Sequence, residues 1–193
     1  MVASVADASE GTLPDLLRPG LKIVLVGINP SVFSAQRGHY FARPTNRFWP
    51  CFSRSILSLE ARQALGVETL KPEHDRALPD YGFGFTDLVK RPTARADQLD
   101  PAEFAAGVGE LTAKLARDKP RIACFHGITG FRAVHRALAA DAPAPQLGEQ
   151  PWRLGPSRLF VIPNPSPANA HATPAQQTAW YDRLAGEVGF KVQ

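Results

Sequence analysis

The stretch from residue 22 to residue 59 carries side chains that commonly contact nucleic acids. It holds five basic residues and no acidic one. The basic residues are Lys22, Arg37, Arg43, Arg47 and Arg54, and the aromatic residues interleaved with them are Phe33, Tyr40, Phe41, Phe48 and Trp49. Basic side chains bind phosphates and aromatic rings stack on bases, so this pattern favours a nucleic-acid partner. The alternative is that the rings belong to the core and the arginines to a solvated face.

Asn29 and Asp87 are the polar residues best placed to do chemistry. An amide such as that of Asn29 can accept from water and donate to a base edge, but it cannot take up a proton at neutral pH. Asp87 is the only acid between residues 81 and 95, and a carboxylate can act as a general base. The alternatives are a turn at Asn29, which precedes Pro30, and for Asp87 an ion pair with Lys90 or Arg91, or a helix cap.

Short apolar runs predict the strands that position these residues. The runs cover residues 22–26, 81–85, 121–125 and 158–162, and helical spacing predicts helices over 45–59, 101–118, 131–140 and 174–187. Asp100-Pro101 and Thr173-Pro174 are typical helix starts. Strands alternating with helices predict an α/β fold, a three-layer α/β/α domain around a short, twisted, mainly parallel sheet.

Polar loops follow all four predicted strands, at residues 27–31, 86–87, 126–127 and 163–167. Because the carboxyl ends of parallel strands meet at one edge, we expect these loops to form the ligand site. Six of the 18 prolines fall in three loops at that edge, and they restrict the backbone there. These prolines are Pro30, Pro44, Pro92, Pro163, Pro165 and Pro167.

Length and composition exclude several classes of protein. The 193 residues fit one domain, which we assign to residues 20–190, with residues 1–19 as a flexible tail. No apolar run approaches the roughly 18 residues of a membrane helix, and the first seventeen residues lack the basic start of a secretory signal, so we expect a cytoplasmic protein without a membrane partner. Cys51 and Cys124 are too few for a disulfide framework or an iron–sulfur cluster, and no histidines have metal-ligand spacing. We therefore expect neither a metal nor a cofactor.

Three blocks of the sequence resemble the motifs of the mismatch-specific uracil- and thymine-DNA glycosylases. They occur in that family's order between residues 20 and 185. The first comprises Gly27-Ile-Asn-Pro30, Ser34-Ala35, Gly38-His-Tyr-Phe-Ala42 and Pro44-Thr-Asn-Arg-Phe-Trp49; the others are Thr86-Asp-Leu-Val-Lys-Arg-Pro-Thr93 and Pro163-Asn-Pro-Ser166. The resemblance implies a uracil-DNA glycosylase-like fold and a monomeric enzyme without a lyase step. It implies hydrolysis of the bond between uracil, or a related damaged pyrimidine, and deoxyribose in double-stranded DNA, after the nucleotide is flipped into a pocket.

The resemblance also implies roles for individual residues. Asn29 would orient the attacking water, Phe41 would stack on the flipped base, and residues 164–170 would enter the helix. The base-binding candidates are Gly27, Ile28, His39, Phe41 and Asn46; the insertion loop is Asn164, Pro165, Ser166, Pro167, Ala168 and Asn169; the phosphate candidates are Arg37, Arg43, Arg47 and Lys90. Because this family has an asparagine where related glycosylases have an acid, Asp87 becomes the candidate general base.

The insertion loop departs from the family pattern. The prototypes place a bulky apolar wedge and an arginine after Asn-Pro-Ser, whereas this chain has Pro167-Ala-Asn-Ala-His171. We therefore expect the protein to excise uracil opposite guanine, and to tolerate other opposite bases more broadly than the prototypes do. Thymine should be a poorer substrate, because its 5-methyl group needs extra room. Two alternatives stay open: a glycosylase of the same fold with another lesion range, and a lesion-binding protein without catalysis.

Overall fold

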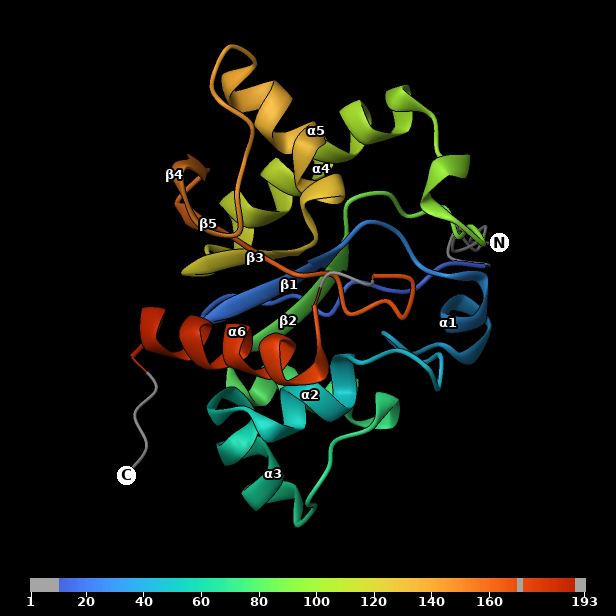
Figure 1. Ribbon diagram of the computed structural model, residues 1–193, viewed down its shortest axis with the longest axis vertical. Coiled ribbons are helices and arrows are strands. Elements are labelled where there is room, and N and C mark those ends of the chain that lie inside the picture. The colour runs from blue at the N-terminus through green and yellow to red at the C-terminus, as the bar shows by residue number, and fades with distance from the viewer. Residues whose placement is uncertain (1–10, 170–171, 190–193) are drawn as a thin grey trace, which may run out of the picture.

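The sheet is mainly parallel, as the apolar runs predict. Figure 1 shows the computed structural model, which describes residues 11–169 and 172–189. The strands are β1 (Ile23–Gly27), β2 (Phe83–Asp87), β3 (Ile122–His126), β4 (Gly148–Leu154) and β5 (Ser157–Ile162). They are ordered β2-β1-β3-β5-β4, and only β4, at one edge, runs antiparallel to its neighbour. The predicted α/β fold class is confirmed.

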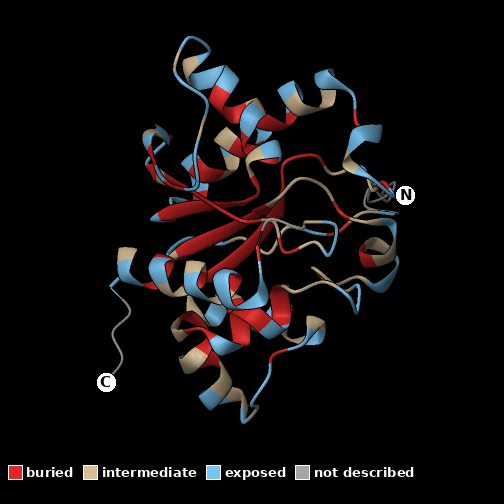
Figure 2. Cartoon of the chain, in the orientation of Figure 1, coloured by how far each residue is buried: buried red, intermediate tan, exposed pale blue. Residues whose placement is uncertain are grey.

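Helices cover both faces of this sheet (Figure 1). They are α1 (Val32–Arg37), α2 (Phe48–Arg54), α3 (Leu59–Leu65), α4 (Pro101–Asp118), α5 (Ile128–Ala139) and α6 (Pro174–Glu187), with short 3₁₀ helices η1 (Ile56–Ser58), η2 (Pro72–Tyr81) and η3 (Ala96–Gln98). Ile23 and Leu25 of β1 join the core beneath α2, α3 and α6, whereas Val24 and Val26 join the core beneath α4 and α5. The central strands are buried on both faces (Figure 2), which explains their unbroken apolar sequence.

Two helices begin where their capping sequences predict. Before α4, the N–H of Asp100 donates to Glu103 Oε2 at 2.9 Å. Before α6, Thr173 Oγ1 accepts from the N–H of Gln176 at 3.2 Å. These bonds satisfy groups that a helix start would otherwise leave without partners. The predicted ranges 101–118 and 174–187 are confirmed.

Other predicted boundaries are wrong. The helix expected over 45–59 is interrupted because Ser55 has extended backbone (φ −87°, ψ 160°), and η1 and α3 follow it. The expected loop after β1 contains α1, which Ser31 caps and Gly38 ends with a φ of 71°. Helix α5 begins at Ile128 rather than near residue 131. Backbone conformation at Ser55 and Gly38 ends two of these helices, and apolar spacing does not detect it.

Strand β4 was not predicted. It contains Glu149, Gln150 and Pro151, so it shows neither an apolar run nor clean alternation. An edge strand tolerates proline because one of its sides makes no ladder hydrogen bonds. Pairing with β5 therefore creates this strand in the absence of strong local propensity.

The prediction of a flexible tail through residue 19 is wrong for residues 13–18, while residues 1–10 lie outside the described chain. Leu13 is 1% exposed. Leu16 exchanges two backbone hydrogen bonds with Phe85, at 2.9 and 3.1 Å. Within the described chain, the helices are too short or too polar to cross a membrane.

Candidate active site

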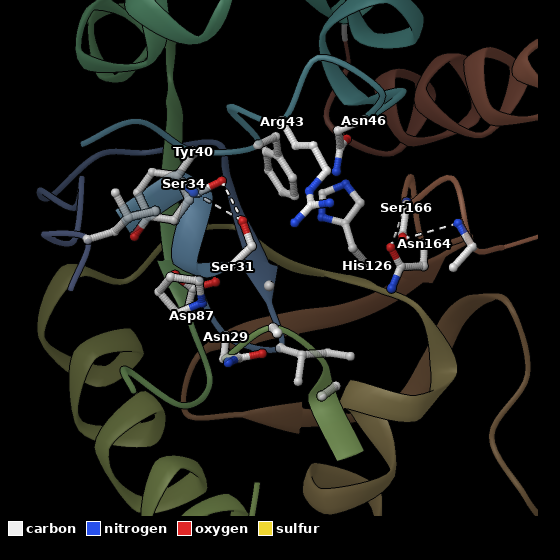
Figure 3. Close-up of a pocket in the computed structure, with 18 of the residues that line it drawn as sticks. Asn29, Ser31, Ser34, Tyr40, Arg43, Asn46, Asp87, His126, Asn164 and Ser166 are labelled. Atoms are coloured by element: carbon white, nitrogen blue, oxygen red, sulfur yellow. Dashed lines mark hydrogen bonds between the residues drawn. The ribbon is translucent and has the colours of Figure 1, made fainter. Parts of the chain in front are cut away.

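The loops after β1, β2, β3 and β5 meet around a pocket of about 340 Å³ (Figure 3). Its wall includes Asn29 after β1, Asp87 at the end of β2, His126 at the end of β3 and Asn164 after β5. Open α/β sheets bind their ligands in this crevice at the carboxyl ends of the strands. Leu13, from the segment expected to be a tail, also lines it.

Asn29 is held in one orientation by the loop that follows β2. Its Nδ2 donates to the Arg91 carbonyl oxygen at 2.9 Å and to Thr93 Oγ1 at 2.7 Å. Three backbone hydrogen bonds, of 2.9, 2.9 and 3.2 Å, tie residues 27–30 to residues 88–93. With both N–H bonds of the amide used, Asn29 presents Oδ1 as an acceptor at the pocket wall.

The carboxyl group of Asp87 is buried, and no ion pair reaches it from residues 11–169 and 172–189. Asp87 is 5% exposed, and its Oδ2 has no hydrogen-bond partner in the described chain. A Cβ on Gly27, its partner on β1, would lie 2.3 Å from Asp87 Oδ1, so this close approach requires glycine. Burial raises the pKa of Asp87 to about 7, and the charge of Asp15 adds to the rise while Lys90 opposes it.

The ion pairs considered as alternatives for Asp87 are not formed among the described residues. Lys90 Nζ lies 2.8 Å from Asp15 Oδ1, and Arg91 Nη2 lies 2.7 Å from Glu103 Oε2. Both cations are therefore paired with other acids. A carboxyl group that is buried, without a partner and titrating near neutrality fits proton transfer better than structure.

Phe41 lies in the pocket wall with a strained backbone. Its φ is 52°, in the left-handed region that a bulky residue seldom adopts. The ring stacks on Phe48 with centroids 4.2 Å apart and meets His126 edge-on at 5.2 Å. Strain of this kind costs about 1–3 kcal/mol and persists where packing enforces it. The result is an aromatic surface fixed inside the pocket.

His39 lies beside the pocket and not in its wall. It lines a neighbouring cavity of about 500 Å³ instead of the pocket, and its Nδ1 is 3.0 Å from Asp75 Oδ1. Asp75 is 1% exposed, and its other oxygen accepts from the N–H of Tyr40 at 2.9 Å. His39 therefore helps to anchor the loop that carries Phe41, and its predicted contact with the base stays a prediction.

The other predicted base-binding residues line the pocket. They are Gly27, Ile28, Phe41 and Asn46. Asn46 Oδ1 accepts from the N–H of Phe48 at 2.9 Å, ahead of α2, which leaves its amide nitrogen as the donor. A Cβ on Gly130 would lie 2.7 Å from Ile28 Cγ1, so α5 packs directly behind this loop.

His126, in the polar loop expected after the third apolar run, ends β3 and lines the pocket. Its Nε2 lies 3.1 Å from the Tyr181 hydroxyl, and its Nδ1 is buried without a partner in the described chain. Burial lowers the pKa of His126 to about 3, so the ring is neutral. The polar loop predicted at residues 126–127 placed His126 at this edge of the sheet, although no role in the site was assigned to its ring.

Residues 164–169 form a tight loop with an exposed tip. Asn164 Oδ1 accepts from the N–H of Ser166 at 2.9 Å, and Asn169 Nδ2 donates to the Asn164 carbonyl oxygen at 2.8 Å. Pro167 and Ala168 are exposed and also line the pocket, together with Asn164 and Ser166. Pro165 and Asn169 lie outside the wall. Asn169 thus braces the loop. Ala170 and His171 lie outside the described residues.

Arg47 donates hydrogen bonds to this loop and to the residue that follows the undescribed positions, and its predicted contact with phosphate stays a prediction. Its Nη1 donates to the Ala172 carbonyl oxygen at 2.6 Å. Its Nη2 donates to the carbonyl oxygens of Ser166 at 2.8 Å and Asn169 at 2.6 Å. The guanidinium therefore satisfies the loop's own carbonyls.

The remaining phosphate candidates separate into two kinds. Lys90 is paired with Asp15, and its predicted contact with phosphate stays a prediction. Arg37 and Arg43 are exposed, with the Arg37 guanidinium 5.3 Å from the centre of the Phe33 ring. Arg43 lines both cavities and points into the pocket (Figure 3). These two arginines remain available to an anionic ligand.

The described residues contain no group of three or more His, Cys, Asp or Glu side chains placed to hold a metal ion. The pocket instead combines an amide acceptor, a buried carboxyl group, a neutral imidazole and an aromatic ring. That set suits a planar polar ring and a water molecule.

Fold and site together define a three-layer α/β protein with a ligand pocket at the carboxyl edge of its sheet. The model of the uracil DNA glycosylase superfamily matches residues 14–185, and the chain belongs to this superfamily. A solved structure with the same fold is the solution NMR structure of a candidate uracil DNA glycosylase from Methanosarcina acetivorans. It is 19% identical, with a TM-score of 0.53, and the match covers 92% of this chain and 96% of that one.

Proposed function

We propose that this protein is a mismatch-specific DNA glycosylase that hydrolyses the N-glycosidic bond of uracil opposite guanine and of related damaged pyrimidines. The observation that carries the proposal is the unpaired, buried Asp87 carboxyl group in one pocket with the Asn29 acceptor and the Phe41 ring. Membership of the superfamily supports the substrate class.

Binding begins with extrusion of the nucleotide, because the glycosidic bond is inaccessible inside a duplex. The exposed tip at Pro167 and Ala168 is placed to fill the space that the base leaves. The flipped base stacks on Phe41, and the amide nitrogen of Asn46 is a donor for a base carbonyl. Arg43, in the wall of the same pocket, supplies positive charge for the DNA phosphates.

The bond between the base and C1′ breaks with its electron pair moving to the base nitrogen. The sugar becomes oxocarbenium-like and the base leaves as an anion. The Phe41 N–H donates to no acceptor within residues 11–169 and 172–189. Such an N–H can stabilise the charge that develops on the leaving base.

Water then attacks C1′. Asn29 Oδ1 accepts a hydrogen bond from this water, which positions it without taking its proton. The Asp87 carboxylate accepts the proton as the new C–O bond forms, and the departing base is protonated from solvent. The products are an abasic sugar and the released base, with one water consumed.

The described pocket wall contains no lysine. A lyase step would need an amine to form a Schiff base with the abasic sugar. We therefore propose a monofunctional enzyme. In line with the resemblance, we also propose that it acts as a monomer on double-stranded DNA.

A strand-cleavage assay tests the proposal. The protein is incubated with oligonucleotides carrying uracil opposite guanine, opposite adenine or in a single strand, and abasic sites are then cleaved with alkali. We expect breaks in all three, with less than about tenfold preference for guanine, since an arginine wedge is lacking and ~1.4 kcal/mol corresponds to tenfold. A strong guanine preference would contradict the predicted tolerance. Tight binding without breaks would establish a lesion-binding protein instead.

A further inference from the structure

The segment before β1 carries an acid that reaches behind the pocket. Residues 13–18 lie along β2, where the Leu16 N–H donates to the Phe85 carbonyl oxygen at 2.9 Å and the Phe85 N–H donates back at 3.1 Å. The Tyr40 hydroxyl donates to the Pro14 carbonyl oxygen at 3.1 Å, so the segment also contacts the loop that holds Phe41. These bonds fix Asp15 beside the end of β2.

Asp15 binds two ammonium groups and one hydroxyl. Its Oδ1 lies 2.8 Å from Lys90 Nζ and accepts from Thr86 Oγ1 at 2.7 Å. Its Oδ2 lies 2.8 Å from Lys114 Nζ, on α4. The cations therefore come from two elements, and the hydroxyl belongs to the residue next to Asp87.

Lys90 and Lys114 are the cations whose charges act most strongly on Asp87. Both lower the pKa of Asp87, whereas burial, the largest influence, and the charge of Asp15 raise it. The Tyr40 hydroxyl also faces this region, and its pKa is raised by burial and by Asp87, Asp15 and Asp75, so it stays neutral. Arg43 and the neutral His126 are the other ionisable groups of the pocket wall in the described chain.

We propose that Asp15 is a positioning residue for Asp87: it holds Lys90 and Lys114 in ion pairs of its own, so that the Asp87 carboxyl group remains without a counter-ion and can exchange a proton. This inference rests on the proposed function, because Asp87 acts through that proton. An Asp87 paired with lysine would stay ionised and would be a weaker base.

Charge-removing substitutions at Asp15 and Lys114 should act in opposite directions. Asp15→Asn leaves two cations near Asp87, so the acid limb of the pH profile for uracil excision should move about one unit lower. The rate at pH 6, relative to its plateau, should then rise about fivefold for a group that titrates near 7. Lys114→Met should move the limb to higher pH.

Glu149→Gln is the matched control. Glu149 belongs to β4, at the opposite edge of the sheet from β2, and its Oε1 lies 2.7 Å from Arg158 Nε. Removing the charge of Glu149 should leave the acid limb in place. A uniform loss of rate across pH in Asp15→Asn, with the limb unmoved, would reveal a merely structural residue and overturn the proposal. If Asp15→Asn does not fold, Lys114→Met decides, and an unmoved limb there would overturn it.

A carboxyl ¹³C titration separates this proposal from the proposed function. The Asp87 resonance is assigned with Asp87→Asn and followed against pH without DNA. A downward shift of this midpoint in Asp15→Asn would support the positioning role, whatever the activity of Asp87→Asn. If Asp87→Asn kept its activity, Asp87 would have no part in the reaction, and only the proposed function would fail. An unchanged midpoint would overturn the positioning role.

Discussion

Asp75 and Asp87 are two buried acids, and they differ in how their oxygens are used. Asp75 is 1% exposed, and both its oxygens have partners, His39 Nδ1 and the Tyr40 N–H. Asp87 is 5% exposed, and its Oδ2 has none in the described chain. Burial is common to both. The satisfied carboxylate fixes a loop, and the unsatisfied one is poised for chemistry.

The largest expected effect is the loss of turnover in Asp87→Asn. The amide cannot accept the proton of the attacking water, so the excision rate at pH 8 should fall by about 10²–10⁴-fold. Binding to uracil-containing DNA should survive, because the pocket keeps its shape. Single-turnover rates and a binding titration measure the two quantities, with Asp80→Asn, an exposed acid on η2, as the control.

The same substitution should stabilise the fold at high pH. Because the pKa of Asp87 is raised from its ordinary 3.8 to about 7, protonation favours the folded state. That contribution is complete below about pH 4 and is lost as the pH rises through 7. Relative to the wild type, Asp87→Asn should therefore gain up to about 4 kcal/mol in unfolding free energy between pH 4 and pH 8. Urea denaturation at both pH values measures it, and a constant difference would mean that Asp87 is not buried as described.

Asp75→Asn should have the opposite effect on stability. It places an amide N–H against either the Tyr40 N–H or the His39 ring, at a loss of about 1–3 kcal/mol. Urea denaturation should show this loss, while Asp80→Asn, whose ion pair with Arg18 is exposed, should change stability by less than about 1 kcal/mol. Equal losses in the two variants would contradict the contrast between the buried acids.

The smallest expected effect concerns the insertion loop. Arg47→Met removes three hydrogen bonds to carbonyl oxygens at residues 166, 169 and 172. The rate of excision from duplex DNA should fall about tenfold, which corresponds roughly to the free energy of one such charged hydrogen bond. The rate on single strands should fall less, because only a duplex has a space that the loop must fill. Arg54→Met, an exposed change on α2, is the control. Equal losses on both substrates would show that the loop has no part in opening the duplex.

The sequence was sufficient for the parts of the molecule that depend on local pattern. Apolar runs predicted β1, β2, β3 and β5, and the Asp-Pro and Thr-Pro starts predicted α4 and α6. It also predicted that Asn29 and Asp87 lie at the same edge of the sheet, and the structure places both in one pocket.

What the sequence could not predict depends on contacts between distant residues. Strand β4 is formed by pairing with β5, and residues 13–18 are ordered by β2. Arg47, Lys90 and His39 were plausible ligands for DNA as isolated side chains, yet each has an internal partner far along the chain. Local sequence gives the type of a side chain, but its availability depends on the tertiary fold.

The pH dependence of single-turnover uracil excision tests the central claim, that Asp87 is the proton acceptor, most directly. For the wild type, the rate should rise about tenfold per pH unit at acid pH and level off near pH 7, where Asp87 titrates. Asp87→Asn should show a rate at least about a hundredfold lower, without that limb. A wild-type rate independent of pH between 5 and 9, or the same limb in Asp87→Asn, would contradict the claim.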